Sequence, residues 1–178
     1  MKPSPSTDVR SMYEATADAY AEMMDQEIDL PVYSDLLGGL KARIANKPGT
    51  LIDTACGSGH MLSMYHDRYE AARPLLGIDL SPRMVAIAGE RLGANGEVLV
   101  GDMCDLSMVE SDSAVGLLNF FAVHHVDPGG LRRALGEWHR VLRSGGQLLI
   151  AAWEGEGVID YGDESDIVAL RYGPDELK

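Results

Sequence analysis

The sequence has few cysteines and no long apolar run. Its two cysteines, Cys56 and Cys104, belong to no CxxC pair and to no pattern rich in metal ligands, which suits a reducing compartment. No apolar run approaches the ~20 residues of a membrane span, and the opening "MKPSPSTDVR" lacks an apolar signal core. We therefore expect a cytoplasmic protein without a membrane partner.

Positive charge is also scarce. The 178 residues include 15 Lys and Arg against 28 Asp and Glu, which gives a formal net charge of −13. The basic residues are scattered, so no patch offsets the repulsion of a nucleic-acid backbone or an anionic bilayer. The length suits one domain, and 46% apolar residues are ordinary for a globular chain. Nucleic-acid substrates are therefore disfavoured.

Short apolar runs alternate with helical patterns from residue 50 to residue 153. The runs read "TLID", "PLLGID", "EVLVGD", "AVGLLNFF" and "QLLIAAW". Ser81 and Pro82 indicate the start of one intervening helix, and an apolar stripe from Leu131 to Leu142 predicts another that ends at Gly145. Two further helices are expected at 9–25 and 32–45. The alternation predicts an α/β fold with a doubly wound, mostly parallel sheet.

Polar residues stand at or just after the ends of the first four expected strands, namely Asp53, Asp79, Asp102 and Asn119. In such sheets, ligands bind beyond the carboxyl ends of the strands. The alternative is that strands simply end in turn-forming Asp and Asn. Four such positions together, with a glycine turn among them, favour a ligand-binding rim.

The glycine turn lies in "TLIDTACGSGHML" at residues 50–62. No Lys follows Gly57 or Gly59, which excludes a phosphate-binding P-loop. The dinucleotide pattern GxGxxG is incomplete, because Leu62 stands at its third glycine. Asp79 lies 20 positions after Gly59, the distance at which an acidic residue accepts hydrogen bonds from a ribose. That feature serves NAD and S-adenosylmethionine equally well.

Five segments in order resemble the class I S-adenosylmethionine-dependent methyltransferases, in particular those that act on small molecules. They are "LIDTACGSGHML", "GIDLSPRMV", "VGDMCDL", "LLNFFAVHHV" and "HRVLRSGGQLLI", within a resemblance that covers residues 9–153. Ala55 replaces the first glycine of the family's usual turn, and Thr54 replaces an aliphatic residue. The segment "NFFA" also differs from the [DN]PP[YF] of enzymes acting on amide or base nitrogens. The resemblance implies a Rossmann-like fold and transfer of a methyl group to a small-molecule acceptor by in-line displacement.

The resemblance also implies roles for individual residues. The turn from Ala55 to Gly59 would bring backbone close to the methionine part of the cofactor, with Asp53 beneath it. Asp79 would hold the ribose hydroxyls, and Leu80 and Met84 would flank the adenine. Asp102 would accept from the adenine amino group, Met103 would stack on the ring, and Asn119 and Phe120 would line the methionine side. For Met84 and Met103, the alternative is core packing. The full expected cofactor-binding set is Asp53, Ala55, Cys56, Gly57, Ser58, Gly59, Asp79, Leu80, Met84, Asp102, Met103, Asn119 and Phe120.

Candidate catalytic residues are His124, His125 and Tyr20. The histidine pair follows the fourth strand, where an acceptor would lie and where an imidazole orients a substrate or takes a proton. The alternative is a structural pair held by loop backbone. Tyr20 lies seven residues after Tyr13 on an expected lid helix, and its alternative is packing of that lid. No metal-ligand spacing occurs among the five histidines, so no metal is expected.

We expect a single domain, 1–178, with a helical lid at 1–46, a cofactor-binding core at 47–153 and an incomplete C-terminal part at 154–178. In that last part "DIVALRY" is a candidate sixth strand, and "GPDELK" resembles the start of a helix. The edge of the fifth strand is expected to be open, which favours a homodimer. Three other classes stay open: a catalytically silent S-adenosylmethionine or S-adenosylhomocysteine binder, a nicotinamide-dependent oxidoreductase, and an aminopropyltransferase-like enzyme on the same fold.

Overall fold

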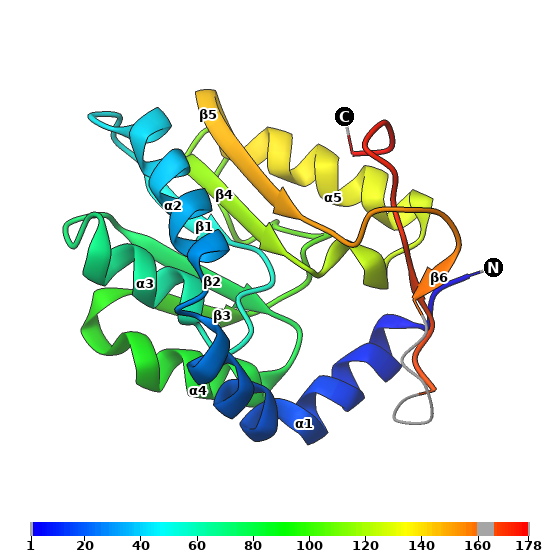
Figure 1. Cartoon of the computed structure of the whole chain (residues 1–178). Helices are drawn as coiled ribbons and strands as arrows, with labels where there is room; N and C mark the ends of the chain where they lie inside the picture. The colour runs from blue at the N-terminus through cyan, green and yellow to red at the C-terminus, as the bar shows by residue number, and fades with distance from the viewer. Residues whose placement is uncertain (1, 160–165, 178) are drawn as a thin grey trace.

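The computed structural model describes residues 2–159 and 166–177, and it contains a parallel sheet of five strands in the order β3-β2-β1-β4-β5 (Figure 1). The strands are β1 (Thr50–Asp53), β2 (Leu75–Asp79), β3 (Glu97–Val100), β4 (Ala114–Phe120) and β5 (Leu142–Ala151). The helices are α1 (Ser6–Glu27), α2 (Pro31–Ile44), α3 (His60–Arg68), α4 (Pro82–Leu92) and α5 (Pro128–Val141), with short 3-10 turns η1 (Gly93–Asn95) and η2 (Val123–His125). The predicted α/β fold is confirmed.

The two central strands, β1 and β4, carry the most buried runs of the sheet. Every residue of β4 before Phe120 is buried, as expected of a strand covered on both faces. Asp53 at the end of β1 pairs with Gly77 of β2 on one side and with Leu118 of β4 on the other. The chain order reverses between β1 and β4, which is where ligands bind in such sheets.

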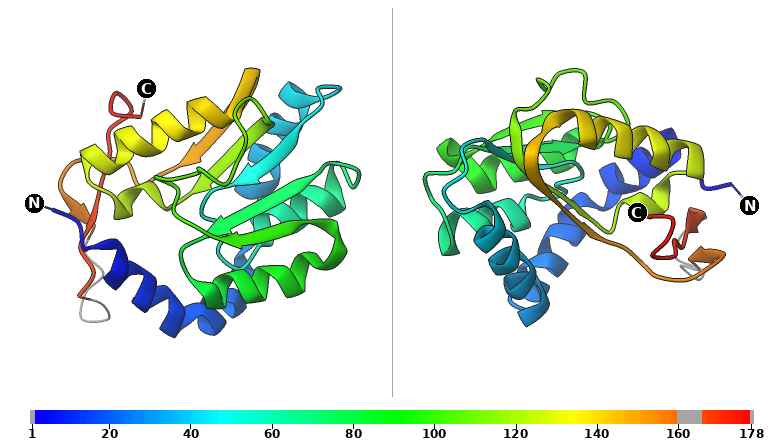
Figure 2. Two further views of the ribbon diagram at one scale, coloured as in Figure 1. Left: turned by 180° about the vertical axis from the view of Figure 1, so that it is seen from behind. Right: turned by 90° about the horizontal axis from the view of Figure 1, so that it is seen from above.

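Helices cover both faces of the sheet (Figure 2). On one face α2, α3 and α4 enclose an apolar cluster that includes Leu37, Leu62 and Leu92. On the other face α5 packs Trp138 and Val141 against the sheet. Trp138 is fully buried, and it lies on the stripe predicted for this helix. The sheet is therefore doubly wound, as predicted.

Helix ends agree with the sequence in one place and differ in another. The Ser81 hydroxyl accepts a hydrogen bond from the Met84 N–H at 3.1 Å, so Ser81 caps α4 as predicted. The prediction that Gly145 ends the fifth helix was wrong. The helix ends at Val141, and Leu142 already pairs with Ala114 of β4. Gly145 has a φ of +75° within the irregular stretch before Gln147 resumes the pairing.

The C-terminal part contributes little regular structure. Within "DIVALRY" only β7 (Ala169–Leu170) is a strand, and it pairs antiparallel with β6 (Val158–Ile159) rather than with β5. The predicted helix start at "GPDELK" was wrong, because the described residues there form only turns. Among the described strands, β5 has β4 as its one neighbour in the main sheet. The homodimer stays a prediction.

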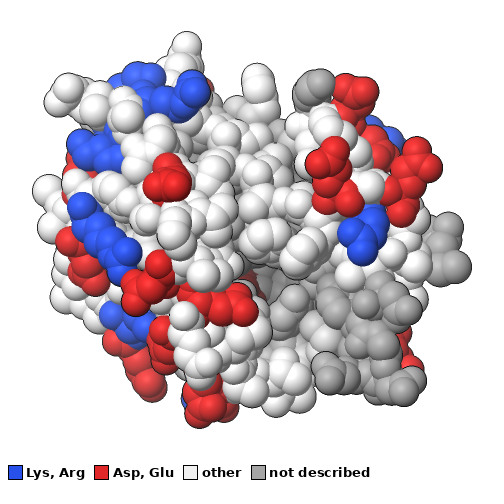
Figure 3. Space-filling view, in the orientation of Figure 1, with Lys and Arg blue, Asp and Glu red and all other residues white. Residues whose placement is uncertain are grey.

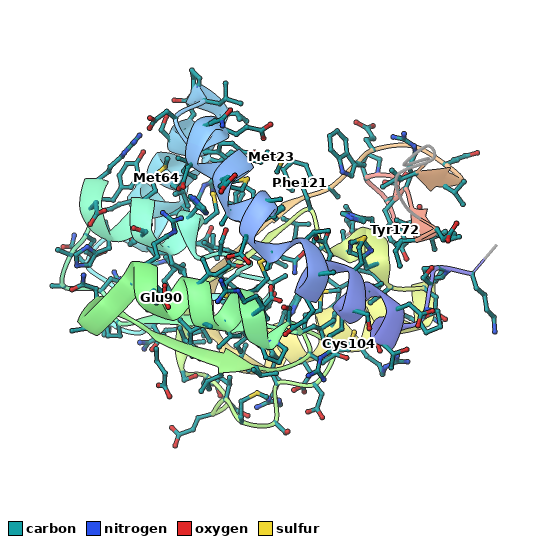
Figure 4. All side chains as sticks on the ribbon, turned by 90° about the horizontal axis from the view of Figure 1, so that it is seen from below. Met23, Met64, Glu90, Cys104, Phe121 and Tyr172 are labelled. Atoms are coloured by element: carbon teal, nitrogen blue, oxygen red, sulfur yellow. The ribbon has the colours of Figure 1, made fainter. Side chains whose placement is uncertain are left out.

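Helix α1 crosses the carboxyl ends of the strands, and Figure 4 shows it in front of the sheet when the molecule is seen from below. Its acidic side chains reach the core at two places. Glu14 accepts from the Ser81 hydroxyl at 2.7 Å, and Asp25 accepts from Arg91 at 2.9 Å. These contacts hold α1 over the end of the sheet where a ligand is expected. No helix in the described part of the chain is long and apolar enough to span a membrane.

Candidate active site

A groove of three adjoining cavities lies between α1 and the carboxyl ends of the strands. The first cavity is lined by Tyr20, Met24, Tyr33, Asp53, Ala55, Cys56, Ser58, His60, Met61, Phe120 and Phe121. The second is lined by Tyr13, Tyr20, Ala55, Gly57, Asp79, Met84, Phe120, Phe121, Ala122 and His125. The third is lined by Val9, Tyr13, Thr54, Ala55, Asp79, Leu80, Met103, Ala122 and His125. Neighbouring cavities share walls, so they form one groove.

The glycine turn forms the floor of this groove. Gly57 has a φ of +51°, and its N–H donates to Asp79 Oδ2 at 2.8 Å. A Cβ at Gly57 would lie 3.3 Å from the ring of Tyr20, so a side chain here would meet the lid. Gly59 has a φ of +82° and precedes α3, where a Cβ would lie 3.0 Å from that of Ala88. Both positions therefore require glycine.

Asp79 ends β2 at the border of the second and third cavities. Its Oδ1 accepts from the Ser81 N–H at 2.9 Å, while its Oδ2 accepts from Gly57. Loss of hydration raises the pKa of this carboxyl, and the two backbone donors oppose the shift. Each oxygen keeps a further lone pair. Asp79 is thus a fixed acceptor facing the groove.

Asp53 ends β1 beneath the first cavity and is 2% exposed. Its Oδ1 accepts from the Ala55 N–H at 3.2 Å. Burial raises the pKa of this carboxyl to about 7, and the neighbouring charge of Asp79 adds to the shift. A buried carboxylate without a cationic partner is costly. The site therefore favours a positively charged ligand group beside Asp53.

His60 is a buried residue of the first cavity that sequence reasoning missed. Its Nδ1 lies 2.8 Å from Ser58 Oγ and its Nε2 lies 2.7 Å from Asp25 Oδ1. Burial lowers the pKa of this imidazole, while the Asp25 hydrogen bond opposes the shift. The available signal was its position directly after Gly59, at the first residue of a helix that begins in the glycine turn. His60 links the floor of the groove to α1.

His125 and Tyr13 form the wall shared by the second and third cavities. The Tyr13 hydroxyl lies 2.9 Å from His125 Nε2, and the two rings meet edge to face. His125 Nδ1 is buried without a hydrogen-bond partner among the described residues. Burial lowers the pKa of His125 to about 4, so the ring is neutral at neutral pH. A neutral imidazole with this pKa orients a ligand better than it takes a proton.

His124 differs from its neighbour, because it lines none of these three cavities. It is 3% exposed, and neither ring nitrogen has a hydrogen-bond partner within the described chain. Burial, with a smaller contribution from His125, lowers its pKa to about 3. The two rings lie 4.1 Å apart between centroids. The structure therefore brings one histidine of the pair to the groove.

Most of the residues predicted from the sequence line the groove. Those that do are Tyr20, Asp53, Ala55, Cys56, Gly57, Ser58, Asp79, Leu80, Met84, Met103, Phe120 and His125. The others are Gly59, Asp102, Asn119 and His124, which lie next to lining residues in the chain.

Two of these other residues shape the groove from behind. Asn119 is fully buried, and its Nδ2 donates to Thr54 Oγ1 at 3.1 Å and to Met103 Sδ at 3.4 Å. Asp102 Oδ1 accepts from the Cys104 N–H at 2.8 Å, which closes the turn that carries Met103. Both therefore position Met103. No group of three metal-ligating side chains occurs within residues 2–159 and 166–177.

Comparison with known proteins identifies the class. A family model for methyltransferase domains matches residues 51–146. Malonyl-[acyl-carrier protein] O-methyltransferase of Pectobacterium atrosepticum is 35% identical over 101 residues, which are 57% of this chain and 37% of that protein. Probable tRNA methyltransferase 9B of Bos taurus is 29% identical over 167 residues, 90% of this chain and 32% of that protein.

Among solved structures, 1,6-didemethyltoxoflavin-N1-methyltransferase of Burkholderia thailandensis, with S-adenosylhomocysteine bound, superposes with a TM-score of 0.72. It is 19% identical, and the match covers 97% of this chain and 73% of that one. The chain belongs to the methyltransferase domain family, and its fold is that of the class I S-adenosylmethionine-dependent enzymes. It spans only about a third of the length of the curated relatives above.

Proposed function

We propose that this chain binds S-adenosylmethionine in the groove under α1 and transfers its methyl group to a small-molecule acceptor by in-line displacement. The observation that carries the proposal is the carboxylate of Asp79, fixed by the N–H groups of Gly57 and Ser81 at the border of two cavities. Each carboxylate oxygen of Asp79 keeps a lone pair that could accept from a hydroxyl of a ribose diol. Asp79 also lies 20 residues after Gly59, the spacing at which an acidic residue binds a ribose.

The proposed orientation follows from the lining of the three cavities. The adenine would occupy the third cavity, between Leu80 and Met103, and the ribose the second, beside Asp79. The methionine part would occupy the first cavity, where Asp53 accepts its ammonium group. The bound cofactor supplies an activated methyl group on a sulfonium. The protein then has to align the acceptor and exclude water.

The candidate catalytic residues act by position in this proposal. Tyr20 lines the first and second cavities, and burial raises the pKa of its hydroxyl to about 12, so it stays a neutral donor. His125 offers a neutral ring beside the ribose and adenine parts. His124 would support His125 from behind. A homodimer remains part of the proposal, and light scattering tests it.

The charge of the chain supports a small acceptor over a polyanion. The formal net charge is −13, and the groove is lined by carboxylates rather than by Lys or Arg in its described part. The neighbour with bound 1,6-didemethyltoxoflavin matches nearly the whole chain. The match covers 73% of that neighbour's own length, against 37% and 32% for the relatives named for acyl-carrier protein and tRNA substrates.

Calorimetric titration with S-adenosylhomocysteine tests the cofactor site. Loss of the ribose acceptor in Asp79→Ala removes charge-assisted hydrogen bonds of about 1.5–3 kcal/mol each, so affinity should fall at least about tenfold. Glu90→Ala is the matched control, because it removes the same charge from the exposed face of α4. Equal affinities for Asp79→Ala and the wild type would contradict the assignment.

Two alternatives have their own tests. A silent binder, suggested by Ala55 in the glycine turn, would bind S-adenosylhomocysteine but transfer no methyl group in a screen of small acceptors. A nicotinamide-dependent enzyme is disfavoured by Leu62, whose side chain is fully buried in the core where a third turn glycine would be needed. Enhanced NADH fluorescence on adding the protein would support that alternative.

A further inference from the structure

Four aromatic rings form a continuous row from the lid to the end of β5. Tyr33 of α2 lies 6.3 Å from Phe120 between ring centroids, and Phe120 lies 6.4 Å from Phe121. Phe121 in turn lies 5.1 Å from Trp153. We call these four residues the aromatic row. It includes both phenylalanines of the chain, although aromatic residues make up only 6% of the sequence.

The row leads from the first cavity to the surface. Tyr33, Phe120 and Phe121 line that cavity, whereas Trp153 at the far end is 50% exposed. Figure 4 labels Phe121, and Figure 3 shows a hollow near the middle of the face. The row therefore joins the lining of the first cavity to an exposed ring.

Phe121 is held in a conformation that a bulky residue rarely adopts. Its φ is +51°, and its N–H donates to the Ala151 carbonyl at 2.8 Å across β5. A left-handed backbone at a residue of this size costs on the order of 1–3 kcal/mol and persists where the surroundings impose it. The strain places the Phe121 ring between the first cavity and Trp153.

The first cavity offers no positive charge to an acceptor. Its described lining contains neither Lys nor Arg, and its ionisable groups are Asp53, Cys56, His60, Tyr20 and Tyr33. His60 is kept neutral by burial, which lowers its pKa. A phosphate, diphosphate or carboxylate on the acceptor would therefore meet no counter-charge here and would face the carboxylate of Asp53.

We propose that the aromatic row is the acceptor platform, and that the acceptor is an uncharged, planar small molecule stacked against Phe121 and Trp153. This inference rests on the proposed function, because it assigns the acceptor side of the same groove. Planar rings stack on aromatic side chains with about 0.5–1.5 kcal/mol beyond the area they bury. The methyl-accepting atom would then point along the row into the first cavity.

A pair of probes that differ only in charge tests the platform. 2-Naphthol is uncharged at neutral pH, and 2-naphthyl phosphate adds an anionic group to the same ring system. Each is titrated by calorimetry into the chain saturated with S-adenosylhomocysteine. We expect 2-naphthol to bind at least about tenfold more tightly than the phosphate, because the phosphate loses hydration without gaining a Lys or Arg partner in the described lining of the first cavity.

Variants of the row locate the binding. Trp153→Leu and Phe121→Leu keep an apolar side chain but remove the stacking ring, and each should weaken 2-naphthol binding about threefold to tenfold. Met108→Leu is the matched control, because Met108 is 47% exposed beside Gly101 at the β3 side of the sheet. S-Adenosylhomocysteine affinity should stay within about twofold of the wild-type value in Trp153→Leu and Met108→Leu, because neither residue lines the three cavities of the groove.

The outcomes separate this inference from the proposed function. Tighter binding of the phosphate, equal binding of both probes, binding of neither, or unchanged binding in both ring variants would overturn the acceptor platform. Each of these results leaves the cofactor site standing if S-adenosylhomocysteine still binds. Failure of S-adenosylhomocysteine to bind the wild type would instead overturn the proposed function.

Discussion

The two ends of the groove are built by different means. At the end beside β1 and β2, carboxylates and glycine backbone hold one another, with Gly57 and Ser81 both donating to Asp79. At the end beside β4 and β5, aromatic and imidazole rings pack together, and three buried ring nitrogens of His124 and His125 have no partner in the described chain. Hydrogen bonds therefore fix the side chains at the first end, whereas packing of rings fixes those at the second.

This difference supports the proposal that the two ends bind different ligands. A cofactor that is the same in every turnover suits a hydrogen-bonded site whose geometry is fixed before binding. An acceptor that differs between relatives suits a packed surface of rings, because substitutions there alter shape without disturbing the cofactor. Four experiments, which change pH or replace a single residue, test whether the two ends differ in this way. They follow in order of decreasing expected effect.

Cofactor affinity should depend on pH through Asp53. Burial raises the pKa of this carboxyl to about 7, so it is neutral below that pH and must lose its proton to pair with the cofactor's ammonium. Affinity for S-adenosylhomocysteine should fall by up to about tenfold per pH unit as pH drops below about 7. Titration from neutral to mildly acid pH measures it, and Asp53→Asn should bind more weakly with a flat profile. The same steep dependence in Asp53→Asn would contradict the role of this carboxyl.

Stability in mild acid should depend on the histidine pair. Burial holds the pKa values of His124 and His125 at about 3 and 4 in the folded chain, below the ~6.5 of an unfolded histidine. As pH falls, the two histidines are therefore protonated in the unfolded chain before they are protonated in the folded chain. The free energy of unfolding consequently decreases below pH ~6.5. At pH ~5 the loss is up to about 2 kcal/mol for each histidine.

Denaturant unfolding of the wild type and His124→Gln at neutral and acid pH measures this contribution. The variant should lose less stability between the two conditions than the wild type does. The comparison cancels the contribution of Asp53, whose raised pKa acts in the opposite direction and lowers stability as pH rises toward about 7. An identical loss in both proteins would show that His124 titrates normally in the fold.

Turnover should depend on His125 more than on His124. His125 lines two cavities and contacts Tyr13, whereas His124 lines none of the three. Loss of one hydrogen-bonding ring costs about 0.5–1.5 kcal/mol, so His125→Gln should lower kcat/KM by up to about tenfold. His124→Gln should lower it less. Equal losses, measured once an acceptor is known, would indicate that the pair acts as a unit.

Backbone strain at Phe121 predicts the smallest effect. Glycine adopts a φ of +51° without a steric penalty, whereas alanine does not. Phe121→Gly should therefore be more stable than Phe121→Ala by about 1 kcal/mol, the reverse of the usual order. Thermal unfolding of the two variants checks this, and the usual order would show that the backbone relaxes when the ring is removed.

Sequence patterns indicate the residues of the proposed cofactor end more directly than those of the proposed acceptor end. Asp53, Gly57 and Asp79 are visible in the sequence because strand ends and a glycine turn have local signatures. Phe121 has none, since its φ of +51° depends on the hydrogen bond to Ala151 of a later strand. His60 was missed for a similar reason, because its partner Asp25 comes from α1.

The alternation of strands and helices, the parallel sheet and the helix cap at Ser81 were also predicted from local patterns, and they are confirmed. The end of α5 was predicted wrongly, because Leu142 continues an apolar stripe that suits either a helix or a strand. Its pairing with Ala114 decides between them, and that contact is not local. Tertiary pairing likewise places Ala169 and Leu170 against β6, where the sequence gives only two short apolar segments.

A crystal structure of this chain with S-adenosylhomocysteine tests the central claim most directly. We expect the ligand in the groove under α1, with its ribose hydroxyls on Asp79, its adenine between Leu80 and Met103, and its amino group beside Asp53. Trp153, at the outer end of the aromatic row, should stay uncovered by the cofactor. Ligand density at the aromatic row with the Asp79 carboxylate uncontacted, or a groove that stays empty at saturating ligand, would contradict the assignment of the two ends.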